Sequence, residues 1–151
     1  MCSREYAWQS LAQHGPLIAI RGSRIIKRSM LHTVVEMPEF CRCAENLGLT
    51  EEERANIIDA VAANPQAGNE IQGTGGARKI RFAAKRKGRG KSGGYRVITF
   101  YSGLGLPVFL ITIYAKSEQD NLTQDQKKKL RTILKSVVEA YKEGKRDEQN
   151  W

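Results

Sequence analysis

Residues 77–115 read ARKIRFAAKRKGRGKSGGYRVITFYSGLGLPVFLITIYA, and this stretch decides the fold because it holds three successive strand signals. The signals are an alternating run over Ala77–Ala84, a β-branched and aromatic run over Tyr95–Tyr101, and the apolar run Val108–Ala115. Glycine-rich connections at 85–94 and 102–107 are typical of antiparallel hairpins. We therefore predict three adjacent antiparallel strands. The most apolar one, Val108–Ala115, is expected to be the central strand of the sheet.

The flanking segments predict one more strand and three helices. The alternating run Leu31–Glu36 predicts the strand. Thr50 and Glu53 have the spacing of a capping box, and so do Thr123 and Gln126. Helices are predicted over residues 38–47, 50–64 and 123–144, the last one ending at Gly144. The order β-α-α-β-β-β-α predicts an α+β fold, a small antiparallel sheet with helices packed on one face.

A length of 151 residues predicts one folded domain, which we expect over residues 30–144. Residues 1–29 lack a sustained hydrophobic period and predict a poorly ordered basic N-terminal extension, with Met30 as a second candidate start of translation. Residues 145–151 are expected to form a C-terminal tail. No apolar run approaches the about 20 residues of a membrane span. Three cysteines make no disulfide framework, so we predict a cytoplasmic protein without membrane attachment.

Positive charge is concentrated in the middle of the chain. The net charge is +9, yet residues 71–116 alone carry 10 basic and no acidic side chains. Residues 36–70 carry 2 basic and 8 acidic side chains, which is the opposite bias. A block of one sign indicates a site for a polyanion, most often a nucleic acid. The alternatives are an ordinary solvated basic face and a patch that an acidic partner covers.

Four cations are expected to meet on the predicted sheet. Lys79 and Arg81 lie on one face of their strand, Arg96 begins the next strand, and Lys116 follows the third. With the strands adjacent, these side chains converge at one end of the sheet, on the solvent side, away from the helices. Each of them alone is an ordinary exposed sheet cation. Their convergence without any carboxylate in the segment favours a functional site.

Other motifs predict no metal or cofactor. Cys41-Arg-Cys43 has no second cysteine pair, and the chain has only two histidines. No Gly-x-Ser-x-Gly elbow for a nucleophilic serine is present. We therefore expect the function to depend on the basic residues rather than on a nucleophile or a bound ion.

Three motifs together resemble the RelE/HigB-type toxins of bacterial toxin–antitoxin pairs. They are GTGGARKIRF at 73–82, KSGGYRVI at 91–98 and FLITIYAKSE at 109–118. The resemblance covers about residues 33–142 and is closest to the HigB branch, which keeps a long Lys/Gly-rich hairpin. It implies a RelE-like fold, and it implies a type II toxin that cuts mRNA on the ribosome.

The resemblance also implies which residues act. Lys79 and Arg81 match the basic pair on one strand of the family. Arg96 matches the arginine of the family's Gly-Tyr-Arg strand, and Lys116 matches the lysine that follows the third strand. Ser117 stands where RelE has an arginine, and Thr123 falls near its tyrosine. Further RNA-binding cations are expected at Arg78, Lys85, Arg86, Lys87, Arg89 and Lys91.

RNA cleavage can use the 2′-hydroxyl of the RNA as the nucleophile, so neither a protein nucleophile nor a metal is obligatory. Clustered cations can stabilise the charge that develops on phosphorus, and a lysine beside other cations can act as acid or base. The expected partners are mRNA, the ribosome and a cognate antitoxin, for which a helix-turn-helix protein is one form. Two alternatives stay open: an RNA-binding translation inhibitor that does not cleave, and a gyrase poison of the related ParE type.

Overall fold

The structure is a computed structural model that describes residues 31–84, 94–103, 105–119 and 121–149, with side chains as far as residue 144. The predicted extension 1–29 and the cations of 85–91 lie outside these residues. The elements are β1 (Val34–Glu36), α3 (Pro38–Asn46), α4 (Glu51–Ala63), β2 (Asn69–Glu70), β3 (Ala77–Phe82), β4 (Tyr95–Phe100), β5 (Val108–Ala115) and α5 (Gln124–Gln149). They confirm the α+β class and the predicted order of elements, to which the two-residue β2 is added.

The sheet is mixed rather than antiparallel, and its strand order is β1-β5-β4-β3-β2. Both predicted hairpins are present, because β4 pairs antiparallel with β3 and with β5. However, β1 pairs parallel with β5, with Val34 opposite Val108. The prediction that Val108–Ala115 is central is therefore wrong. β4 is the central strand, and all six of its residues are buried.

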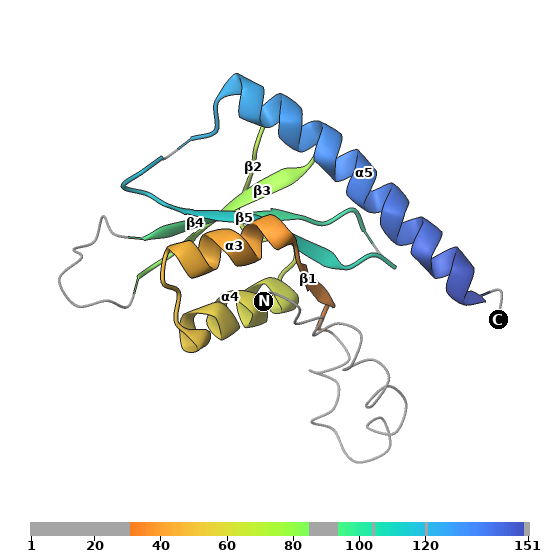
Figure 1. The fold of residues 1–151 in the computed structure, drawn as a ribbon, viewed down its shortest axis with the longest axis horizontal. Helices are drawn as coiled ribbons and strands as arrows, with labels where there is room; N and C mark the ends of the chain where they lie inside the picture. Colours follow the sequence, from red (N-terminus) through yellow and green to blue (C-terminus); the bar gives the residue numbers. More distant parts are fainter. Residues whose placement is uncertain (1–30, 85–93, 104, 120, 150–151) are drawn as a thin grey trace, which may run out of the picture.

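Helices cover both faces of the sheet, so the predicted packing on one face is also wrong (Figure 1). Phe40 of α3 and Ile57 of α4 belong to one core cluster, with Val97 of β4. Leu130 of α5 belongs to a second cluster, with Ile98 of β4. Val97 and Ile98 are consecutive and point to opposite faces. β4 and β5 are apolar on both faces, so each face requires its own cover.

Local signals set the helix starts as expected. The Thr50 hydroxyl accepts from the Glu53 amide at 3.1 Å, and the Glu53 carboxylate accepts from the Thr50 amide at 3.0 Å. The predicted stop at Gly144 is wrong, since α5 continues to Gln149. An interior glycine costs a helix only about 0.5–1 kcal/mol, which does not end it. Within the described residues, no helix combines the length and apolar character that a membrane crossing requires.

Candidate functional site

The register of the sheet brings the predicted cations to one end. Arg81 of β3 lies opposite Arg96 of β4, and Arg96 lies opposite Tyr114 of β5. Lys79 lies two residues before Arg81 and therefore on the same face. The Lys116 amide donates to the Gly94 carbonyl oxygen at 3.0 Å, which holds Lys116 at this end of the ladder. We call Lys79, Arg81, Arg96 and Lys116 the cationic end.

The cationic end shares its sheet face with α5, so the prediction of a face away from all helices is wrong. Ala77 precedes Lys79 by two residues and packs in the α5 core cluster. In that cluster α5 covers Ala77, Phe100 and Phe109, which lie toward the opposite end of the face. The cations therefore begin where the cover by α5 ends.

The four cations differ in exposure. Arg81 and Lys116 are exposed, and Lys79 is half-buried. Arg96 is only 5% exposed, so its predicted place on the solvent side is wrong. The reason is that β4 is central, with β3 and β5 on its two sides.

Gly94, two residues before Arg96, lets β4 approach β3 closely. A Cβ atom at Gly94 would lie 2.6 Å from the Phe82 carbonyl oxygen and 3.8 Å from Nη1 of Arg96. The first distance is shorter than real Cβ contacts, so a larger residue at 94 would push β4 away from β3. Nη1 of Arg96 donates to the Tyr95 carbonyl oxygen at 3.5 Å. Arg96 is thus a charge fixed within the sheet, while Arg81 is a charge on its surface.

The predicted RNA-binding residue Arg78 does not join the cationic end. It alternates with Lys79 and lies on the face of Ile80 and Phe82, which pack against the α3 and α4 core. Its Nη1 donates to the Gly68 carbonyl oxygen at 3.0 Å, so it ties β3 to the loop before β2.

Two residues at the site were not predicted from the sequence. Tyr114 is half-buried and lies opposite Arg96. It also lines a groove of about 850 Å³ between α3, the end of β5 and the start of α5. Asn121 accepts a hydrogen bond from Nζ of Lys79 at 2.9 Å. An irregularity at Ile98/Thr99 shifts the pairing of β4 with β5 by one residue, so that Tyr114 rather than Ile113 lies opposite Arg96. A count from the turn does not show this shift, and Asn121 has no local signal.

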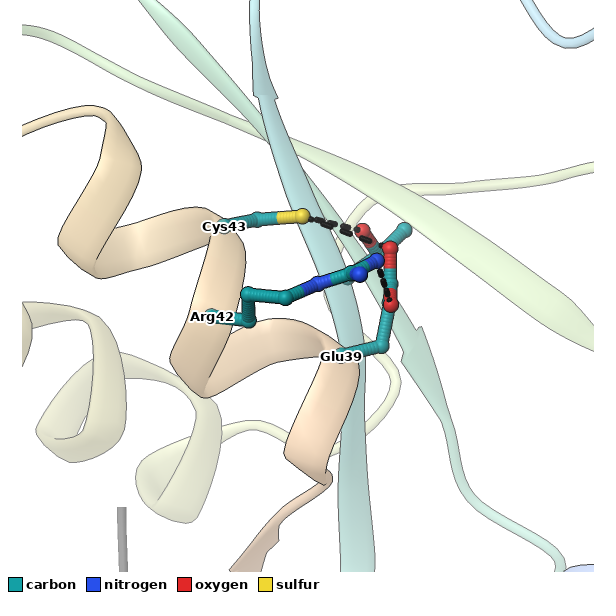
Figure 2. Close-up of polar contacts among 4 residues, drawn as sticks. Glu39, Arg42 and Cys43 are labelled. Carbon is teal, nitrogen blue, oxygen red and sulfur yellow. Dashed lines mark hydrogen bonds and ion pairs between the residues drawn. The ribbon is translucent and has the colours of Figure 1, made fainter. Parts of the chain in front are cut away.

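The two cysteines of the structured domain make contacts with neighbouring side chains. Figure 2 shows Arg42 paired with Glu39 and the Cys43 thiol donating to the same carboxylate, at 3.4 Å. Burial raises the pKa of the Cys43 thiol, a hydrogen bond from the Thr112 hydroxyl lowers it, and Glu39 raises it. A raised pKa lowers the fraction of reactive thiolate. Among the residues that the structure describes, no three His, Cys, Asp or Glu side chains gather as metal ligands do.

The fold and the site together define a class of protein: a small α+β domain whose mixed sheet carries several basic side chains toward one end. The family model of the RelE toxin of the RelE / RelB toxin–antitoxin system matches residues 32–147. The chain therefore belongs to the RelE toxin family, which confirms the resemblance. This makes it a toxin of a toxin–antitoxin system that inhibits translation. Its assignment to the HigB branch stays a prediction.

Among solved structures, the chain is similar to the Escherichia coli toxin RelE in the free state, in a mutant with two arginines replaced by alanine. The sequence identity is 17% and the TM-score is 0.42. The match covers 60% of this chain and 88% of that chain.

Proposed function

We propose that this toxin is a ribosome-dependent endoribonuclease that cuts mRNA by attack of the RNA's own 2′-hydroxyl. The observation that carries the proposal is the cationic end, where the pairing of β3 with β4 sets Arg81 opposite Arg96. The resemblance of residues 33–142 to the mRNA-cutting branch supports the same chemistry.

The protein must assist the formation of one bond, the cleavage of another and the charge that develops between these two steps. The 2′-hydroxyl loses its proton and its oxygen bonds to phosphorus. The bond from phosphorus to the 5′-oxygen breaks, and that oxygen takes up a proton. The products are a 2′,3′-cyclic phosphate and a 5′-hydroxyl end. Between these steps the phosphate carries extra negative charge, which fixed cations stabilise more than water does.

We assign the roles by exposure and mobility. Arg96 is buried and Arg81 lies beside it, so the two arginines hold the phosphate. Lys79 and Lys116 carry ammonium groups, which can give up a proton more readily than a guanidinium, and they are the two candidates for the proton transfers. The ribosome contributes by holding the message in place, which replaces positioning that a free ribonuclease must supply itself.

The proposal includes partners and location. A toxin that cuts messages harms its own cell, so a cognate antitoxin must cover or disable the cationic end. A helix-turn-helix antitoxin, as in HigB-type pairs, is the form we propose. Since its substrate is mRNA on the ribosome, the toxin acts in the cytoplasm.

Primer extension on a translated message tests the reaction. Discrete cuts within codons that require ribosomes support the endonuclease. Inhibition of translation with intact message supports the non-cleaving RNA binder. DNA damage with intact message supports a ParE-like gyrase poison, and either of the last two results contradicts the proposal.

Neutralising the predicted hairpin cations should weaken binding rather than chemistry. Replacing Lys85, Arg86, Lys87 and Arg89 with Gln should reduce ribosome association, because unspecific attraction to phosphate comes from net charge. The salt dependence of ribosome binding should become shallower, by a slope of about one per lost phosphate contact. The measurement is the dissociation constant across a salt series. An unchanged slope would contradict an electrostatic role for this segment.

A further inference from the structure

The connection between β5 and α5 passes the cationic end. Nζ of Lys79 donates to Oδ1 of Asn121 at 2.9 Å, although the two residues lie 42 positions apart in the chain. This contact joins β3, which carries the cation, to the segment that leads into α5. It is a non-local bond to a residue of the proposed cleavage site.

Hydrogen bonds connect the segment around Asn121 to the end of β5 on one side and to the start of α5 on the other. Nε2 of Gln119 donates to the Asn121 carbonyl oxygen at 2.7 Å and to Oε1 of Gln126 at 2.6 Å. The same Oε1 accepts from the Thr123 amide at 2.9 Å, as part of the capping box of α5. The Gln119 amide donates to the Ala115 carbonyl oxygen at 3.2 Å, which anchors the connection to the end of β5.

We infer that Asn121 is a positioning residue that sets where the Lys79 ammonium group lies over the cationic end. A lysine side chain has four rotatable bonds, so an ammonium group on a free stem samples many positions. An acceptor held by the helix cap and by β5 restricts these positions before substrate arrives, which is the requirement for a preorganised site. The inference rests on the proposed function, because Lys79 receives its role there.

Two substitutions separate the acceptor from the rest of the side chain. Asn121→Leu keeps the size but removes the oxygen, and it should lower kcat for cleavage on programmed ribosomes about tenfold with KM unchanged. Asn121→Asp keeps an oxygen at the same position and should still hold the Lys79 ammonium group, but its negative charge also acts on the site, so this variant is read by the mobility of Lys79 rather than by kcat. Gln124→Leu, an exposed change in the first turn of α5, is the matched control and should have no effect.

A double-mutant cycle separates positioning of Lys79 from a general structural role. In the Lys79→Ala background, Asn121→Leu should cause no further loss of kcat, since the group that it positions is gone. A second, independent loss in that background would overturn the inference, and so would Asn121→Leu with wild-type kcat. Wild-type kcat in Lys79→Ala would overturn it as well, since the role of Lys79 would be lost.

A measurement that does not depend on RNA cleavage, the mobility of the Lys79 side chain, separates this inference from the proposed function. In the full-length toxin, side-chain relaxation of isotope-labelled lysine should show a restricted Lys79 that becomes mobile in Asn121→Leu and stays restricted in Asn121→Asp. Failure of wild-type toxin to cut mRNA would refute the proposed function, whatever the mobility of Lys79. Equal mobility in wild type and Asn121→Leu would refute the positioning contact, whatever the cleavage result.

Discussion

Arg81→Ala should lower the rate of mRNA cleavage by about 10²–10³-fold, the usual effect of removing one preorganised donor to the transition state. The side chain is exposed and lies opposite Arg96 on the face of the cationic end. Because it is exposed, its loss leaves no cavity, and the free energy of unfolding should stay within about 0.5 kcal/mol of wild type. The measurements are primer extension at saturating ribosomes and urea-induced unfolding.

An exposed arginine elsewhere provides the control for Arg81. Arg131→Ala makes the same change of charge on α5 and should cut at the wild-type rate. Arg96→Ala is less suitable as a test of the site. Arg96 is 5% exposed, so truncating it also removes packing in the central strand and should destabilise the fold. Normal cutting by Arg81→Ala would mean that the active face is assigned wrongly.

Arg54→Leu should lower the free energy of unfolding by about 3–5 kcal/mol, the effect of removing one partner of a buried ion pair. Nε of Arg54 lies 2.6 Å from Oε1 of Glu36, and the two side chains are 16% and 5% exposed. The Arg54 guanidinium also donates to Sγ of Cys41 at 3.2 Å and lies over the Phe40 ring, 6.0 Å from its centroid. Arg54 of α4 therefore holds together α3 and β1.

The reason for the large effect is the carboxylate that remains. In Arg54→Leu the Glu36 side chain stays in a site with 5% exposure, and its loss of hydration is no longer compensated. The double variant Glu36→Leu/Arg54→Leu should recover most of the stability, because the buried charge is then absent. Urea-induced unfolding of the wild type and of the two variants measures both effects. A loss below about 1 kcal/mol in Arg54→Leu would show that the pair behaves as a surface ion pair.

Signals within a few residues predicted the elements well. Both capping boxes are correct, since the Gln126 amide donates to the Thr123 hydroxyl at 3.2 Å and Glu53 closes the first box. The strands Ala77–Phe82 and Tyr95–Phe100 begin at the predicted residues, the first from its alternation and the second from its β-branched and aromatic residues. These features depend on side chains that meet within one helical turn or one hairpin, and such contacts follow from spacing alone.

Strand order and layering depended on partners far away in the chain. β5 is the most apolar strand, and this indicated a central place, but the short β1 pairs with it and leaves β4 in the centre. Apolarity reports burial on both faces, which β5 has because α3 and α5 lie on opposite sides of it. It does not report how many strands lie on each side.

The sequence by itself determined where the positive charge lies, since residues 71–116 hold ten basic and no acidic side chains, a block that favours a polyanion or a covering partner. Period-two alternation also determined that Lys79 and Arg81 share a face. Only the tertiary structure decided that Arg96 is buried, since burial depends on the two strands that flank it and on the close approach at Gly94. Only the tertiary structure brought Asn121 to Lys79, because a hydrogen bond between segments distant in the chain produces no periodic pattern in the sequence.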